Sequence, residues 1–295
     1  MILYFILAPS AAMEASRRGL SLWFHQLLPV LLPFCVLSYV VLGSNVFSSS
    51  DWSRTNQGKI GVKEWYILFC GFIFGFPIGS KLSTDLYREK QISRRNAMIL
   101  CCFANNLSPV FATTAMTEML GITIDYKFYL LLYGIPFLVC VILLAVYGEK
   151  QSQVEETKKN TASGFHVNMQ IVDAGIINGF ETLIKICGYI LLFSILSEIL
   201  RTIPWGNSHL KQILIGCTEV TNGMAELSGA VCPSSAKYLL AILFLSWNGI
   251  SGLFQTASIL SGTDLSIKQY LKAKICLTVF IVVTATILFF LGVLI

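Results

Sequence analysis

The sequence has little charge and few polar stretches. Of its 295 residues, 13% are Asp, Glu, Lys or Arg, whereas 55% are hydrophobic, and the mean hydropathy is +0.71. Soluble globular domains carry roughly 25% charged residues, so the composition excludes that class and indicates a polytopic membrane protein. The net charge of +5 is not gathered into one basic patch. We therefore expect a lipid bilayer around the chain and no nucleic-acid partner.

Motifs of catalysis and metal binding are also absent from the sequence. The nine cysteines include no C-x-x-C pair and no zinc-like spacing, and most of them lie inside apolar runs. The three histidines, His25, His166 and His209, are far apart, and no H-E-x-x-H, G-x-S-x-G, Walker or dinucleotide-binding motif occurs. We expect no enzyme, no catalytic residue, no metal and no cofactor.

Apolar segments follow one another along the chain, and one long polar connection, 148–164, divides them into two halves. Residues 1–9 lack the basic start and the cleavage site of a signal peptide. We predict the end of a first membrane helix at 1–10, a first repeat at 11–148, a polar cytoplasmic linker at 149–165 and a second repeat at 166–295. The apolar segments are 11–43, 65–82, 96–120, 126–148, 172–203, 211–231, 238–260 and 273–295.

The two halves contain the same kinds of segment in the same order. Each begins with a segment, 11–43 or 172–203, that as one helix would be about 48 Å long, against roughly 30 Å for a bilayer core. Pro29 and Pro33 interrupt the first of these segments, and Lys185 with Gly188 interrupts the second. We therefore predict that both are re-entrant helical hairpins. Each half then has two segments with polar interruptions and closes with a plainly apolar helix. Two of the interrupted segments, "NNLSPVFATT" and "NGISGLFQTA", match at four positions, the first pair being Asn105 and Asn248.

The distribution of Lys and Arg between loops predicts the orientation. Loop 81–95 is the most basic and is the strongest cytoplasmic candidate. With the two predicted hairpins, four connections face the cytoplasm and two face outside, and the halves become inverted copies of each other. We thus expect an all-α polytopic membrane protein with an inverted structural repeat and discontinuous transmembrane helices. The cytoplasmic connections are 81–95, 148–164, 201–211 and 261–274, and the outer ones are 121–125 and 232–236.

Four interruptions in apolar segments indicate where a ligand binds. They lie at Gly75–Lys81, Asn105–Pro109, Glu219–Gly223 and Asn248–Gly252. Broken helix is tolerated in a membrane only where protein or water surrounds it, and helix N-termini that meet there attract anions. Discontinuous helices at corresponding positions of two halves are the best sequence indication of a transporter's binding site. The predicted substrate-binding residues are Gly75, Pro77, Gly79, Ser80, Lys81, Asn105, Asn106, Ser108, Glu219, Asn222, Gly223, Asn248, Ser251 and Gln255.

Most of these residues also have a simpler interpretation. Gly75 and Gly79 would also suit close helix packing, and Pro77 would also suit a plain kink. Lys81 could extend to the lipid headgroups as an ordinary flanking lysine. The amides of Asn105, Asn106, Asn248 and Gln255 could hydrogen-bond helices together. Glu219 is the hardest to explain in this way, because an ionisable group near the middle of a membrane segment is costly.

Several segments resemble a known family, the YlbJ-type sporulation integral membrane proteins, within the wider nucleoside-recognition or Gate domain group. The family pattern is G-x-P-x-G-[AS]-K, then a charged D/E-L-Y loop, then N-N-x-S-P. It corresponds here to "GFPIGSK" from Gly75, "DLY" from Asp85 and "NNLSP" from Asn105. The second half is similar more loosely, through "EVTNGMAEL" and "SWNGISGLFQTASIL". There the chain departs from the family pattern, with Asn248-Gly249 in place of two adjacent glycines and no histidine.

The resemblance implies two Gate-like repeats in a multi-pass membrane protein of endospore-forming bacteria, made in the mother cell. It also implies a task, moving dipicolinic acid towards the developing spore. Dipicolinate is a small aromatic dianion, which agrees with a site of helix N-termini, amides and a lysine. Relatives in the wider group include nucleoside carriers, so the family alone leaves the ligand open.

Three functions remain open at this stage. The first is a carrier of a small organic anion with possible proton coupling at Glu219, in which Lys81, Asn105, Asn106, Glu219 and Asn222 converge on one cavity. The second is a nucleoside transporter, in which Phe76, Trp247 or Phe254 would stack on the base. The third is a non-transporting scaffold for spore-envelope assembly, which predicts a packed core without a cavity. The sequence sets neither the coupling ion nor the oligomeric state.

Overall fold

The computed structural model describes residues 1–44, 60–149, 168–204 and 207–294, and within these ranges every regular element is helical. The expected all-α class is thus confirmed. The predicted linker 149–165 lies, apart from Glu149, outside the described residues. The helices of the first half are α1 (Ile2–Leu7), α2 (Pro9–Leu22), α3 (Leu28–Gly43), α5 (Val62–Phe74), α6 (Ile78–Arg88), α7 (Arg94–Phe103), α8 (Pro109–Thr114), α9 (Tyr126–Tyr129) and α10 (Ile135–Tyr147). Those of the second half are α11 (Met169–Thr202), α12 (Ser208–Thr218), α13 (Val220–Ser228), α14 (Ser234–Trp247), α15 (Gly249–Leu260) and α16 (Ile267–Phe290).

The two segments that we predicted as hairpins are instead continuous helices, and that prediction is wrong. α11 is one unbroken helix of 34 residues that passes through Lys185 and Gly188. In the first half, α2 continues through a π-helical turn, Trp23–Leu27, directly into α3. Pro29 falls in the first turn of α3, just after the π-helical turn, and Pro33 lies inside it. The wider π-helical turn accommodates Pro29, and the helix continues through Pro33 without reversing.

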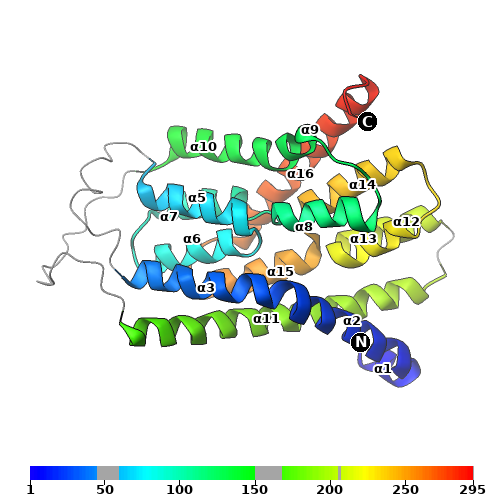
Figure 1. Cartoon of the computed structure of the whole chain (residues 1–295), viewed down its shortest axis with the longest axis horizontal. Helices are drawn as coiled ribbons and strands as arrows, with labels where there is room; N and C mark the ends of the chain where they lie inside the picture. The colour runs from blue at the N-terminus through cyan, green and yellow to red at the C-terminus, as the bar shows by residue number, and fades with distance from the viewer. Residues whose placement is uncertain (45–59, 150–167, 205–206, 295) are drawn as a thin grey trace, which may run out of the picture.

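The two long segments pack against each other along their length. α11 contacts both α2 and α3, which run antiparallel to it in Figure 1. Small residues allow this close approach. A Cβ added at Gly175 would lie 3.3 Å from the Val36 backbone oxygen, and one added at Gly43 would lie 2.9 Å from the Ile171 side chain. The extra residues of the two segments therefore form helix that packs along the other segment, and they do not form a turn.

The chain reverses direction directly after each long segment, within a pair of short helices. α5 runs to the middle of the bundle, and α6 returns to the end from which α5 started; α12 and α13 do the same from the opposite end (Figure 1). Each pair is closed by facing glycines. A Cβ on Gly79 or Gly71 would meet the Ala104 carbonyl oxygen within 2.3 Å, and one on Gly223 would lie 2.2 Å from the Gly216 Cα. A side chain at Gly71 or Gly79 would push the α5–α6 pair away from the end of α7, and one at Gly223 would push α13 away from α12, so both close contacts depend on these glycines.

Two further helices cross the bundle with an interruption. α7 and α8 are separated by residues 104–108, and α8 continues into a π-helical turn, Ala115–Met119. α14 and α15 are separated only by Asn248, which has a left-handed backbone conformation with φ 67°. All four predicted interruptions are therefore present. Because α11 crosses the bundle once, its C-terminal end and the start of α12 lie at the end opposite loop 89–93 (Figure 1), so the prediction that 201–211 shares a side with 81–95 is wrong.

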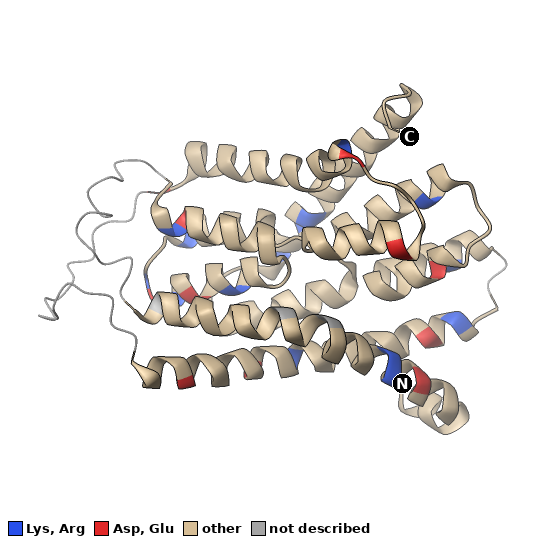
Figure 2. Cartoon of the chain, in the orientation of Figure 1, with Lys and Arg blue, Asp and Glu red and all other residues tan. Residues whose placement is uncertain are grey.

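Four helical stretches within the described residues are long and apolar enough to cross a membrane, namely Tyr126–Tyr147, Met169–Thr202, Ser234–Leu260 and Ile267–Phe290. The first of them contains α9, the π-helical turn Leu130–Gly134 and α10. Figure 2 shows most charged residues near the two ends of the bundle and long uncharged stretches between them. Buried apolar side chains form two clusters, and Phe103, at the end of α7, contacts both. The interruption after α7 therefore lies where the two apolar cores meet.

Candidate binding site at the helix interruptions

The interruption between α5 and α6 lies directly against the one between α7 and α8. Gly75 has φ +76°, and a Cβ added to it would lie 2.3 Å from the Ser108 backbone nitrogen. The next peptide bond, Phe76–Pro77, is cis. Ser108 accepts a hydrogen bond from the Phe111 N–H at 3.2 Å, and Pro109 follows it, so this pair starts α8 as an N-cap and first-turn proline. Gly75 is thus required for both its conformation and its close backbone contact.

Asn105 joins the two halves of the chain at this place. Its side-chain oxygen accepts from the Ser80 N–H of α6 at 3.3 Å, and its side-chain nitrogen donates to the Thr256 and Tyr270 hydroxyls, each at 3.3 Å. Its backbone oxygen accepts from the Asn248 side chain at 3.2 Å. Asn105 is completely buried, so these bonds satisfy groups that would otherwise be unpaired inside the protein.

The second-half interruptions meet in a similar way. Glu219 is buried and caps α13, because its two carboxylate oxygens accept from the Thr221 and Asn222 N–H groups at 3.1 and 2.8 Å. A carboxylate at a helix N-terminus is favoured both as a hydrogen-bond acceptor and by the helix dipole. A Cβ added at Gly249, the first residue of α15, would lie 3.2 Å from the Glu219 Cα. The burial of Glu219 is therefore explained by its place at a helix start.

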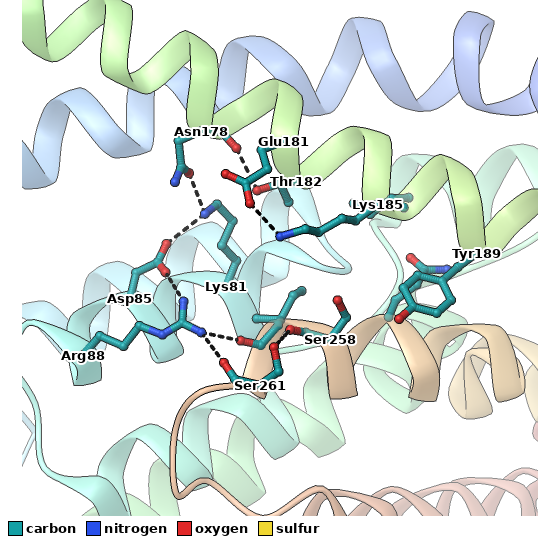
Figure 3. Close-up of a pocket in the computed structure, with 13 residues that line it drawn as sticks. Lys81, Asp85, Arg88, Asn178, Glu181, Thr182, Lys185, Tyr189, Ser258 and Ser261 are labelled. Carbon is teal, nitrogen blue, oxygen red and sulfur yellow. Dashed lines mark hydrogen bonds and ion pairs between the residues drawn. The ribbon is translucent and has the colours of Figure 1, made fainter.

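A cavity of about 140 Å³ lies beside these interruptions, between α6, α11 and the C-terminal part of α15. Lys81 reaches from α6 towards α11, where its ammonium donates to the Asn178 side-chain oxygen at 2.7 Å and pairs with Asp85 at 2.9 Å (Figure 3). The residues that line the cavity are Lys81, Asp85, Arg88, Asn178, Glu181, Thr182, Lys185, Ile186, Tyr189, Gln255, Ser258, Ile259 and Ser261.

Charged side chains surround the cavity on two sides. On α11, Lys185 pairs with Glu181 at 2.7 Å, and both side chains are more than half exposed. On α6, Arg88 pairs with Asp85 at 3.5 Å and donates to the Ile259 and Ser261 backbone oxygens at 3.0 and 2.7 Å. The cavity is therefore open at its rim and polar, which suits a small polar or charged ligand better than an apolar one.

The predicted site residues divide between this cavity and the interruptions. Of the fourteen, Lys81 and Gln255 line the cavity. Gln255 donates to Ser251 at 3.0 Å, one turn earlier on α15. Of Lys81, Asn105, Asn106, Glu219 and Asn222, which we expected to converge on one cavity, only Lys81 lines this one. The physical reason is that Asn105 and Glu219 use their side chains to satisfy backbone groups at helix ends. The others, Gly75, Pro77, Gly79, Ser80, Asn106, Ser108, Asn222, Gly223, Asn248 and Ser251, lie in or next to the interruptions.

Lys81 does not behave as an ordinary flanking lysine. Its side chain is only 12% exposed, and it is held on both sides by Asp85 and Asn178. Sequence analysis missed Asn178, Glu181 and Lys185, which contribute one face of α11 to the cavity. A signal for them exists, because these polar residues recur at spacings of three and four within an otherwise apolar segment.

Another residue that sequence analysis missed is Lys274, which counted there only as part of a basic loop. It lies on α16, is 2% exposed, and donates to the Asn106 side-chain oxygen at 3.1 Å and the Asn105 backbone oxygen at 3.4 Å. Within the described residues, no group of His, Cys, Asp and Glu side chains has the arrangement of a metal site.

The apolar helices and the buried polar interruptions between them define a multi-pass helical membrane protein. The chain is similar to the sporulation integral membrane protein YlbJ of Bacillus subtilis (strain 168), with 27% identity over 311 aligned positions that cover 90% of this chain and 75% of that protein. This similarity, together with the motifs around Gly75 and Asn105, supports a membrane protein of the YlbJ type. No protein-family model matches the sequence, and no solved structure matches it.

Proposed function

We propose that this protein is a membrane carrier of a small organic anion, which binds in the cavity beside Lys81. The observation that carries the proposal is the polar cavity itself, which lies between the continuous helix α11 and two helices, α6 and α15, that begin at interruptions in the bundle. Interrupted helices next to a polar cavity are typical of secondary transporters, whose substrates bind near the middle of the membrane.

The charges around the cavity favour an anion. Lys81, Arg88 and Lys185 oppose two carboxylates, those of Asp85 and Glu181, so the lining has one excess positive charge. An anionic ligand would compete with Asp85 for Lys81 and with Glu181 for Lys185.

The cargo that we propose is dipicolinate, carried during endospore formation. Two lines of support are the similarity to a sporulation integral membrane protein and the size and charge of the cavity. A carrier in a membrane derived from the mother cell would place this anion on the route to the developing spore.

We further infer that the two halves are inverted structural repeats, with α5–α6 and α12–α13 as the re-entrant pairs. The order of long helix, helix pair, interrupted helix and single helix is the same in both halves, and corresponding elements run in opposite directions (Figure 1). The end where α6 stops faces the cytoplasm in this proposal, because basic residues gather there. These residues are Arg88, Lys90, Arg94, Arg95, Lys268 and Lys272.

Uptake of labelled dipicolinate into proteoliposomes tests the proposed cargo. The intact chain is expected to give saturable uptake, and Lys81→Met is expected to raise KM about tenfold, because a charge-assisted hydrogen bond is lost while the aliphatic stem is kept. Lys272→Met is the matched control, since Lys272 is an exposed lysine of α16 outside the cavity.

No saturable uptake by folded wild-type protein would overturn the anion proposal. An equal KM for Lys81→Met and the wild type would keep transport but remove the cavity as its site. The folded state of each variant is checked by its thermal unfolding in detergent, so that a loss of uptake is not confused with a loss of fold.

A second candidate cargo is a nucleoside, as carried by relatives in the wider Gate group. The observation that favours it is that the cavity also contains the amides of Asn178 and Gln255 and the ring of Tyr189. These groups could hydrogen-bond and stack on a base. Phe254 is half-exposed on the outside of α15, and Trp247 donates its indole N–H to the Cys217 backbone oxygen. Uptake of uridine that survives Lys81→Met but not Gln255→Ala would favour this cargo; uptake of neither compound would favour the scaffold.

A further inference from the structure

A lysine ammonium is buried at the interruption between α7 and α8 without a carboxylate partner. Lys274 comes from α16, and its two hydrogen-bond acceptors are the Asn106 side-chain oxygen and the Asn105 backbone oxygen, at 3.1 and 3.4 Å. Among the described residues it forms no ion pair.

Both acceptors belong to the segment that follows the C-terminus of α7. The last carbonyls of a helix have no partner within the helix and carry partial negative charge. One of them, the Phe103 oxygen, accepts from the Asn106 side-chain nitrogen at 2.8 Å, which turns the Asn106 oxygen towards Lys274. The site therefore offers neutral oxygen ligands and the negative end of a helix to one positive charge.

This arrangement has the chemistry of a monovalent-cation site. Hard cations are bound by backbone and amide oxygens, and carriers with interrupted helices coordinate sodium through unwound carbonyls at helix C-terminal ends. The ligand here is an ammonium that the chain itself provides.

We infer that Lys274 occupies a monovalent-cation position as a tethered cation, so that the wild-type protein needs no sodium at this site. Asn105 joins α6, α15 and α16 here, so the ammonium supplies positive charge where the two halves meet. The inference does not depend on which cargo is carried or on transport at all, because it concerns what the oxygens around Lys274 bind.

Thermal unfolding in detergent tests this inference without any uptake measurement. Lys274→Ala removes the ammonium and leaves a cavity beside the two oxygens. We expect the Tm of this variant in choline chloride to fall well below that of the wild type. Sodium or methylammonium chloride at the same ionic strength is expected to recover about 3 °C or more of the loss, because a cation that binds only the folded state stabilises it. The wild type is expected to unfold at the same temperature in all three salts.

Three controls separate a cation site from a simple hydrogen bond. Lys272→Ala, in an exposed position of the same helix, is expected to show no salt-specific change. Lys274→Met, whose side chain fills the space without a charge, is expected to lose stability and to gain nothing from sodium. Asn106→Ala in the Lys274→Ala background is expected to abolish the recovery, because it removes one of the two oxygens.

Several results would overturn the inference. One is a Lys274→Ala variant whose Tm rises in neither sodium nor methylammonium chloride. A variant that cannot be obtained in folded form in any of the three salts counts as the same result. Another is Lys274→Met with the stability of the wild type, since the charge would then contribute nothing. A third is a wild type that sodium stabilises over choline through Asn106, since the position would then be free for sodium.

Discussion

Two clusters of charged residues lie along α11, and they differ in charge balance and in openness. The cavity cluster consists of Lys81, Asp85, Arg88, Glu181 and Lys185 and surrounds a cavity of about 140 Å³. The second, which we term the closed cluster, consists of Arg18, Glu198, Arg201 and Glu226.

The closed cluster ties three helices together through ion pairs. Arg201 pairs with Glu198 on α11 at 2.9 Å and with Glu226 on α13, while Arg18 of α2 also pairs with Glu198. Arg18 also pairs with Glu14 at 3.8 Å, so two arginines face three glutamates, whereas the cavity cluster has one cation in excess. The comparison shows that α6 and α13, which occupy corresponding places in the two halves, contact α11 differently. α13 is locked by a complete ion-pair network, and α6 leaves charge available to a ligand.

Removing the central arginine of the closed cluster is expected to have the largest effect. In Arg201→Met, the partly buried carboxylates of Glu198 and Glu226 lose their shared partner. Breaking such a pair by removing one side leaves uncompensated charge and costs about 3 kcal/mol. Thermal unfolding in detergent measures this, with the exposed Lys272→Met as the control. A Tm equal to that of the wild type would show that the network contributes no stability.

The glycines at the two helix pairs come next. Gly75→Ala places a Cβ 2.3 Å from the Ser108 nitrogen at a residue with φ +76°, and Gly223→Ala places one 2.2 Å from the Gly216 Cα. Each is expected to destabilise the protein by about 2 kcal/mol through overpacking and, at Gly75, backbone strain.

Gly188→Ala is the matched control for these two changes. No atom lies within 4 Å of its added Cβ, so it is expected to gain up to about 1 kcal/mol from helix propensity. The same denaturation experiment compares all three variants. A loss of stability in Gly188→Ala as large as in Gly75→Ala would remove the steric explanation.

In the cavity cluster, a substitution is expected to improve function: it lowers KM, and the effect is smaller than the losses of stability above. Asp85→Asn removes the carboxylate that pairs with Lys81 at 2.9 Å while keeping the shape of the side chain. An anionic cargo would then meet a lysine without a competing charge, and KM for dipicolinate uptake is expected to fall about threefold, in line with the modest strength of a partly exposed pair. The control variant Glu198→Gln, which changes a carboxylate of the closed cluster, is expected to leave KM unchanged. A higher KM in Asp85→Asn would show that Asp85 itself orients Lys81 for the cargo.

The smallest effect concerns the loop between α15 and α16. A hydrogen bond from the Tyr87 hydroxyl, with help from Arg94, lowers the pKa of Asp264 below its ordinary value of 3.8. A carboxylate with a lowered pKa stabilises the folded state above its unfolded pKa, and this contribution is lost as the pH falls through the folded pKa. Asp264→Asn is therefore expected to lower the Tm slightly at pH 7. The difference from the wild type is expected to shrink as the pH falls below 3.8 and to vanish below the lowered pKa of Asp264. A difference that persists in acid would point to a contact other than the charge.

Local sequence determined the positions of the four helix interruptions. Gly75, Ser108–Pro109, Glu219 and Asn248 each change the backbone or cap a helix by themselves. Their chemistry acts over a few residues, so it can be read without the fold. The membrane class likewise follows from composition alone.

The positions where the chain reverses were decided by tertiary packing. Pro29 and Pro33 looked like turn positions, yet α2 and α3 stay continuous because α11 packs along both. The reversals lie instead where Gly71 faces Gly79 and Gly216 faces Gly223, pairs that only the folded chain brings together.

The roles of individual polar residues divide in the same way. The sequence by itself indicated Lys81 and Asn105 through the motifs that contain them. It gave no indication that Lys274 would leave a basic loop for the interior, or that Asn178 and Lys185 would share a cavity with Lys81. Those roles depend on contacts between residues far apart in the chain. The packing of whole helices decides which residues are buried and which are paired, so residue propensities and sequence spacing do not predict these contacts.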